Sequence, residues 1–116
     1  MNHYISRPIL CERLRLGLLQ SYRIAPPNYG ALLDYGKIVR LLNECRVGME
    51  VQHEMPSDIL TADELASELT DSGITAHRLR VFSRRKRNPL PHFRFNKNTL
   101  RYTRTHFHNW LKGKTK

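Results

Sequence analysis

The chain has 116 residues and a mass of 13.7 kDa, which suits one compact domain or two small lobes and excludes a large multidomain enzyme. Apolar residues make up 40% and charged residues 26% of it, an ordinary globular composition. No apolar run approaches the roughly 20 residues that span a bilayer. Glu12, Arg13 and Arg15 also interrupt the apolar stretch that a signal peptide would need. We therefore expect a soluble intracellular protein with no membrane partner.

The net charge of +10 is distributed unevenly along the chain. Residues 72–116 contain 13 Lys and Arg and no Asp or Glu, whereas residues 1–71 contain 7 basic and 10 acidic residues, a balance of −3. A field of one sign attracts phosphate backbones. Solubility alone rarely removes every acid from 45 consecutive residues, and this half shows no helix with the broad apolar face that lies in a lipid interface. We therefore expect the C-terminal half to bind nucleic acid.

The first 55 residues predict a mostly helical lobe. Pro8 indicates the start of a helix that ends before the breaker at residues 25–28. Its apolar stripe consists of Ile9, Leu10, Leu14, Leu18 and Leu19. A second helix is predicted over residues 34–46, and residues 49–53 alternate weakly, as in a short strand. No motif assigns this lobe more than packing, self-association or docking of a partner.

Two short helices joined by a tight turn are predicted next. Thr61 and Glu64 have the spacing of a capping box at the start of the first helix. Gly73 belongs to the turn, and Thr75 is the predicted N-cap of a helix that runs to about Lys86. This arrangement is typical of a helix-turn-helix. The inward side of the second helix carries Leu79 and Phe82.

The outward side of that second helix combines basic and apolar residues. At about 100° per residue, the positions opposite the inner residues recur at helical spacing. Arginine can bond guanine O6 and N7, and valine can meet a thymine methyl group. We therefore assign four residues to base edges in a major groove: His77, Arg80, Val81 and Arg84. The neighbouring cations are assigned to phosphates: Arg78, Arg85 and Arg87.

A β-hairpin and a last helix complete the chain. Residues 92–95 and 99–102 alternate polar and apolar side chains on either side of a turn at 96–98. Three cations on the hairpin are assigned to phosphates or a minor groove: Arg94, Lys97 and Arg101. Thr103 or Thr105 is the predicted cap of the last helix, whose inward residues are Phe107, Trp110 and Leu111.

Helix, turn, helix, hairpin and helix in this order resemble the winged-helix DNA-binding domain of phage excisionases and the related small regulators akin to MerR. The resemblance covers residues 60–111 and rests on Leu60–Ala66, Gly73–Thr75, Leu90-Pro91, Arg101-Tyr102 and Trp110-Leu111. It implies a mainly α fold with a small β-hairpin wing over residues 56–116, beside the helical lobe of residues 1–55.

The resemblance also implies a function without catalysis. Such a protein binds double-stranded DNA, either as an excisionase that acts with an integrase or as a transcriptional regulator of a phage or mobile element. It further implies a bacterial or phage-encoded protein of the cytoplasm, associated with the nucleoid.

Catalytic and metal sites are not expected. His106 and His108 would lie about 200° apart around a helix, so they cannot easily share one ion. The basic half contains no carboxylate that could hold Mg²⁺ beside DNA. His92 is expected near phosphate, and Cys11 and Cys45 are expected as packed thiols. No catalytic residue, metal ligand or cofactor is assigned.

Two alternative functions remain at this stage. The first is an RNA-binding or ribosome-associated protein that stacks bases on Phe93, Phe95 and Tyr102. The second is a protein-interaction adaptor of the antitoxin or anti-repressor type, in which the N-terminal helices do the main work.

Overall fold

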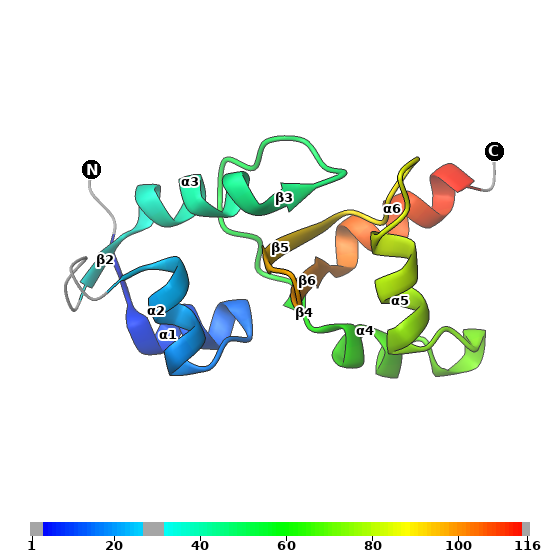
Figure 1. Ribbon diagram of the computed structural model, residues 1–116, viewed down its shortest axis with the longest axis horizontal. Coiled ribbons are helices and arrows are strands. Elements are labelled where there is room, and N and C mark those ends of the chain that lie inside the picture. Colours follow the sequence, from blue (N-terminus) through cyan, green and yellow to red (C-terminus); the bar gives the residue numbers. More distant parts are fainter. Residues whose placement is uncertain (1–3, 27–31, 115–116) are drawn as a thin grey trace.

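The computed structural model describes residues 4–26 and 32–114. Over these ranges the chain is a mixed α/β protein with six α-helices and two small antiparallel sheets. It is elongated, 44 × 24 × 22 Å, with helices α1–α3 toward one end, α4–α6 at the other and a sheet between them (Figure 1). The elements are β1 (Tyr4–Ser6), α1 (Arg7–Leu14), α2 (Leu18–Ile24), β2 (Leu32–Asp34), α3 (Tyr35–Cys45), β3 (Arg46–Val47), β4 (Ile59–Leu60), α4 (Ala62–Glu68), the 3₁₀ turn η2 (Thr70–Ser72), α5 (Ala76–Ser83), β5 (His92–Asn96), β6 (Thr99–Thr103) and α6 (Arg104–Lys114).

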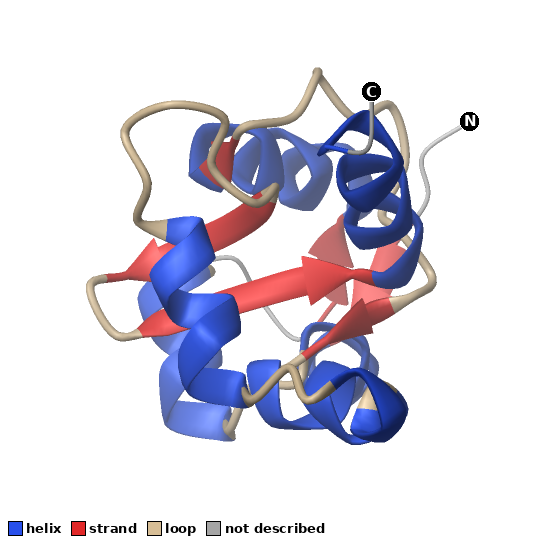
Figure 2. Ribbon diagram, turned by 90° about the vertical axis from the view of Figure 1, so that its right-hand side faces the viewer, coloured by secondary structure: helices blue, strands red, loops and turns tan. Residues whose placement is uncertain are grey.

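The predicted hairpin is present, and it forms the centre of a four-stranded antiparallel sheet with the order β3-β5-β6-β4. Strand β3 pairs with β5 at Arg46 and Phe93, and β4 pairs with β6 at Leu60 and Tyr102. Figure 2 shows these strands with helices on both sides of them. Both outer edges of the hairpin are therefore covered, one of them by a strand from the part of the chain predicted to be a separate helical lobe.

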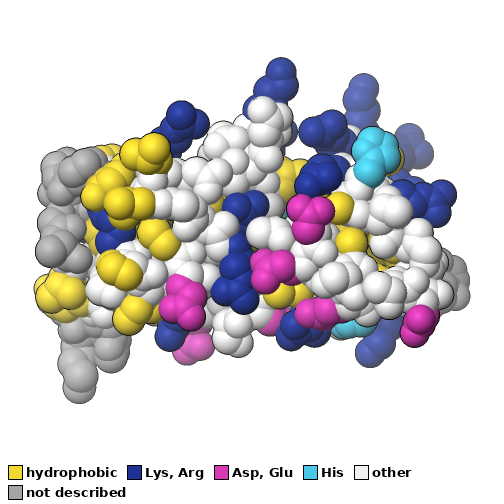
Figure 3. Space-filling view, turned by 90° about the horizontal axis from the view of Figure 1, so that it is seen from below, with side chains coloured by type: hydrophobic (Ala, Val, Ile, Leu, Met, Phe, Trp, Pro, Cys, Tyr) yellow, Lys and Arg dark blue, Asp and Glu magenta, His cyan; other side chains and the backbone are white. Residues whose placement is uncertain are grey.

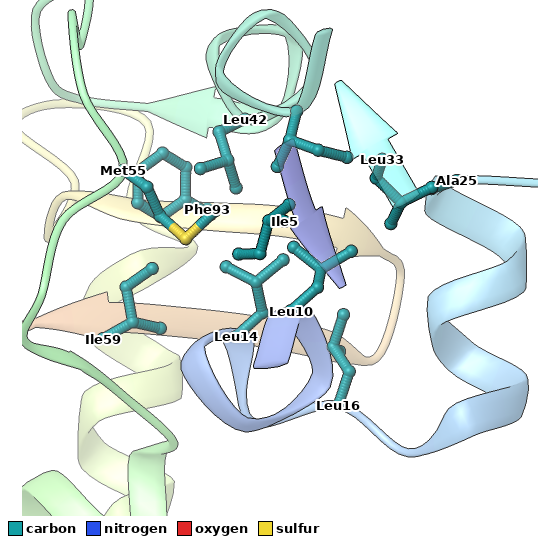
Figure 4. Close-up of a cluster of buried hydrophobic side chains, with 11 residues drawn as sticks. Ile5, Leu10, Leu14, Leu16, Ala25, Leu33, Leu42, Met55, Ile59 and Phe93 are labelled. Atoms are coloured by element: carbon teal, nitrogen blue, oxygen red, sulfur yellow. The ribbon is translucent and has the colours of Figure 1, made fainter. Parts of the chain in front are cut away.

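The central sheet separates two hydrophobic cores. Successive side chains of a strand point to opposite faces of a sheet. In β4, Ile59 belongs to the core formed with α1 and α3, whereas Leu60 belongs to the core formed with α4, α5 and α6. Phe93 lies in the first core, among Leu14, Leu42 and Met55 (Figure 4). The N-terminal and C-terminal halves thus share one sheet and are not independent packing units.

The single N-terminal helix predicted over residues 8–24 is wrong, because the chain breaks between α1 and α2. Arg15 adopts a left-handed conformation with φ 56°. The Leu16 amide then donates to the Cys11 carbonyl at 2.9 Å, and the Arg15 amide donates to Glu12 at 3.3 Å. This pair of bonds is a Schellman cap, which ends the helix by satisfying its last carbonyls. Leu18 and Leu19, predicted on the inner stripe, are exposed as a result.

Helix α3 confirms the second prediction for this half. The Asp34 side chain accepts a hydrogen bond from the Lys37 amide at 3.2 Å and caps the helix. The strand predicted at residues 49–53 is absent, because the strand that pairs with β5 comes immediately after the helix. Gly48 then turns the chain at φ 71°, where an added Cβ would meet the Pro89 carbonyl oxygen at 3.0 Å. Only glycine fits this turn without strain.

Helices α4 and α5 begin where the sequence predicted. Thr61 and Glu64 form the reciprocal capping box, with N···O distances of 3.1 and 3.0 Å. Gly73 takes the left-handed conformation at φ 74°, and the Thr75 hydroxyl accepts from the Arg78 amide at 3.2 Å. Helix α5 ends at Ser83, earlier than predicted. The reason is local, because the chain folds back so that the Leu90 amide donates to the Phe82 carbonyl at 3.1 Å.

Helix α6 is capped from two places. Thr103 is confirmed as its cap, since its hydroxyl accepts from the His106 amide at 3.2 Å. Thr105 instead donates its amide and hydroxyl to the Asp58 carboxylate, at 2.9 and 2.8 Å. Partial burial opposes ionisation of Asp58, but these bonds from Thr105 dominate and lower its pKa. No helix within the described ranges is long and apolar enough to cross a membrane.

Candidate nucleic-acid interface

The outward side of α5 is exposed, as its helical spacing predicted. His77 lies on the surface, and 47% of Val81 is accessible to solvent. Arg84 is exposed as well, but its predicted place within the helix is wrong, because α5 ends at Ser83. The inward residue Leu79 is fully buried in the second core. Three of the four residues assigned to base edges therefore present their side chains to solvent together, at one end of the molecule.

The fourth of these residues, Arg80, is only partly exposed. Its Nη2 lies 3.9 Å from the Asp63 carboxylate of α4. An exposed ion pair at this distance contributes little free energy. Arg80 can therefore leave Asp63 for another acceptor, but it is less available than Arg84.

The basic run after α5 is held against the second core rather than continuing the helix. The Arg85 guanidinium lies over the Phe82 ring, with its Cζ 4.8 Å from the ring centroid. Arg85 remains exposed to solvent in this position. The Trp110 indole N–H donates to the Asn88 carbonyl at 3.0 Å and fixes the end of the run. Arg87 is exposed between these two anchors. Lys86 is exposed in the same run, but it was not predicted as a phosphate contact. Its position within four consecutive basic residues, 84–87, could have indicated it.

Two of the three hairpin cations are exposed. Arg94 lies on β5 and Lys97 lies in the turn between β5 and β6. Over the described residues, no hydrogen bond or ion pair engages the side chain of either one. Both are placed where a ligand could reach them from solvent.

The assignment of Arg101 to a phosphate is not supported by its surroundings. Its Nε donates to the Leu14 carbonyl at 3.0 Å and its Nη2 donates to the Arg15 carbonyl at 2.7 Å. Its Nη1 donates to the Leu100 carbonyl at 2.7 Å. Arg101 thus caps the end of α1 from across the sheet. Burial lowers its pKa, but an arginine stays charged at neutral pH.

The charges segregate on the surface. Figure 3 shows Lys and Arg side chains gathered at the upper right edge, over the C-terminal end, with Asp and Glu on the near face below them. Some of these acids pair with basic residues of the same chain. The exposed Glu68 carboxylate, for example, accepts two hydrogen bonds of 2.7 Å from Arg104. These bonds lower the pKa of Glu68. The acids of residues 47–71 therefore partly neutralise the C-terminal half, where Glu68 pairs with Arg104 and Asp63 with Arg80 of α5. Over the described residues, no ion pair engages the basic run of residues 84–87.

The aromatic residues of the hairpin are unsuited to stacking on bases. Phe93 and Tyr102 are fully buried, and Phe95 is half-buried against the first core. The Tyr102 hydroxyl is 2.8 Å from the Ser83 hydroxyl, inside the protein. The RNA-binding alternative therefore loses its three stacking residues, while the basic residues that it also used stay exposed.

Histidine and cysteine do not form a recognisable metal site over the ranges described. No group of three His, Cys, Asp or Glu side chains comes close enough to hold an ion. Cys11 and Cys45 are half-buried free thiols, and burial raises the pKa of Cys45. The expectation that His92 lies near phosphate is wrong, since its side chain is buried and Nδ1 donates to the Leu90 carbonyl at 2.7 Å.

The buried His92 predicts a pH dependence of stability. Burial lowers its pKa below the ordinary 6.5, although the bond to Leu90 opposes the shift. The unfolded chain then binds a proton at pH values where folded His92 stays neutral. The free energy of unfolding should therefore fall as the pH decreases through 6.5, and this loss should stop below the lowered pKa.

Urea titrations at a series of pH values between about 7.5 and 5 measure this dependence. In the variant His92→Asn, the amide can still donate to Leu90 but does not titrate. We expect a smaller change of unfolding free energy over this range for the variant than for the wild type. Equal changes for both proteins would assign the dependence to other groups.

Comparison of the chain with protein-family models, with curated proteins and with solved structures finds no match. The residues themselves and the surface that they form are therefore the basis of the proposed function.

Proposed function

We propose that this chain binds double-stranded DNA without catalysis, as a winged helix-turn-helix protein. Helix α4 supports α5, and α5 lies in the major groove with His77, Arg80, Val81 and Arg84 toward base edges. The β5–β6 hairpin is the wing, and it contributes Arg94 and Lys97 to phosphates. Arg78, Arg85 and Arg87 contact phosphates beside α5, whereas Arg101 holds the protein's own backbone and is no longer included.

One observation supports this proposal most directly. His77 and Val81 are exposed on α5, and Arg84 is exposed directly after it. Residues 72–116 contain no Asp or Glu that could repel a phosphate backbone. The alternative is an arginine-rich helix face that only contacts water. Such a face gives no reason for an exposed apolar residue such as Val81 at its centre. A valine between cations suits a groove, where a thymine methyl can replace water against it.

Selection of preferred sites from a random duplex library tests the base contacts. Arg84→Ala should relax the preference at one base-pair position and weaken binding to the selected site by about 1–3 kcal/mol, or roughly 5- to 150-fold. Arg87→Ala should weaken binding to all sequences alike. Fluorescence anisotropy with the selected duplex and with a scrambled duplex measures both effects.

A matched control is Arg40→Ala, which removes an exposed arginine from α3 in the other half. It should leave affinity and preference unchanged. The proposal is contradicted if Arg84→Ala and Arg40→Ala behave alike, or if the wild type forms no complex with any duplex in dilute buffer.

Two biological roles use the same surface, and we propose that the protein has one of them. An excisionase bends and coats an attachment site beside an integrase, whereas a regulator of a phage or mobile element occupies an operator. Energy transfer between dyes at the two ends of the selected duplex separates them. A marked approach of the ends on binding favours the excisionase role, and an unchanged distance favours operator binding.

A further inference from the structure

The N-terminal end of the molecule carries an apolar face that the elements of residues 4–26 and 32–114 leave open. Tyr4, Ile9 and Leu32 line a surface hollow over β1, α1 and β2, and they are 57%, 45% and 61% exposed. Leu18 and Leu19 of α2 add exposed apolar side chains to the same half. Figure 3 shows apolar side chains gathered at this end, on the left. Exposed apolar patches of this kind mark interaction sites in soluble proteins.

The hollow also carries one charge of each sign. Arg13 of α1 and Glu54 of the loop before β4 both line it. Over the described residues, neither side chain has a hydrogen bond or ion pair, and they do not pair with each other. The face thus offers an unused cation and an unused carboxylate around an apolar centre.

This charge arrangement decides which occupant fits. Duplex DNA is disfavoured, because the Glu54 carboxylate lines the hollow and would repel a phosphate backbone. An anionic lipid surface is disfavoured by the same carboxylate. In a two-fold dimer, by contrast, residue i of one copy meets residue j of the other, and j meets i. Arg13 of one copy can therefore meet Glu54 of the other, and the symmetry gives the same ion pair a second time, on either side of a shared apolar centre.

We propose that this face pairs with the same face of a second copy, forming a two-fold symmetric dimer. Ile9, Tyr4 and Leu32 of the two copies exclude water at its centre. Arg13 of each copy pairs with Glu54 of the other. The inference does not depend on the proposed DNA binding, because it concerns the opposite end of the molecule.

Charge reversal provides a test that a general loss of stability cannot imitate. The wild type should sediment as a dimer of twice 13.7 kDa. In Arg13→Glu, and separately in Glu54→Arg, like charges face each other, so each variant alone should sediment as a monomer. An equimolar mixture of the two variants restores both ion pairs and should sediment as a dimer of one copy of each.

Two matched controls reverse exposed charges outside the hollow: Arg23→Glu on α2 and Glu44→Arg on α3. Both should remain dimeric. Ile9→Glu should be monomeric and should not be rescued by mixing, because it places a charge in the apolar centre. Circular dichroism checks that each variant is folded.

A wild type that stays monomeric at all concentrations overturns the proposal and leaves the face for a different partner. Dimers that persist in both single reversals, or a mixture that stays monomeric while Arg23→Glu and Glu44→Arg dimerise, overturn the paired arrangement of Arg13 and Glu54.

Discussion

Replacing Phe93 with alanine is expected to lower the free energy of unfolding by about 3 to 5 kcal/mol. Phe93 is fully buried and lies in the core that α1 and α3 build against the sheet. It also occupies the position where β5 pairs with Arg46 of β3. The truncation therefore leaves a cavity at the point where the two halves of the chain meet, and rigid strands on both sides limit its collapse.

Urea unfolding followed by circular dichroism measures this effect. Leu19→Ala is a suitable control, because Leu19 is 80% exposed and its truncation should change the unfolding free energy by no more than about 0.5 kcal/mol. A loss below about 1 kcal/mol for Phe93→Ala would mean that the packing of the N-terminal half on the sheet contributes little. Deletion of residues 1–55 would expose Phe93 and Ile59, so the shortened chain is a poor test of DNA binding.

Duplex DNA complexes should weaken several hundred-fold between about 50 and 200 mM monovalent salt. Five cations remain assigned to phosphates: Arg78, Arg85, Arg87, Arg94 and Lys97. Each neutralised phosphate releases condensed counterion, so the slope of log affinity against log salt should be near −4.5. This large effect follows from the number of contacts, without knowledge of the target sequence.

Titrations at several salt concentrations give the slope directly. Arg94→Ala should make it shallower by about 0.9, whereas Arg40→Ala, on the far half of the molecule, should leave it unchanged. A slope close to zero for the wild type would exclude phosphate binding by this surface. A slope that Arg94→Ala does not alter would remove the hairpin from the interface.

Local signals predicted the C-terminal half well. The capping box at Thr61 and Glu64, the N-cap Thr75 and the hairpin turn act within a few residues, and the structure confirms each of them. Their free energies come from hydrogen bonds between sequence neighbours. The exposed positions of α5 followed from helical periodicity alone.

Long-range packing decided what the sequence could not predict. The alternation of the hairpin predicted one buried face, but β3 and β4 cover its edges and both faces carry a core. Because the hairpin was predicted to have an exposed face, Arg101 was assigned to a phosphate simply as a cation on that hairpin. Its actual partners, Leu14 and Arg15, lie 87 and 86 positions away in the chain. No local pattern encodes that pairing.

The end of α5 was predicted too far along the chain. Arginine and lysine favour helix, and the helix was predicted to continue to about Lys86. The structure ends the helix at Ser83, where the chain folds back and the Leu90 amide donates to the Phe82 carbonyl. Two cations assigned on helical spacing, Arg85 and Arg87, are instead placed by the loop and by stacking on Phe82.

The adjacent residues Ile59 and Leu60 set a strict length for the segment before α4. Surface connections usually accept an added or a lost residue at little cost. Here a shift of one position would exchange the sides that the two side chains face, displacing an apolar group from each core at once. Asp58, which caps α6, would move with them. A stretch that reads as an ordinary proline-containing connection is thus one of the places where this chain can least tolerate a change in residue number.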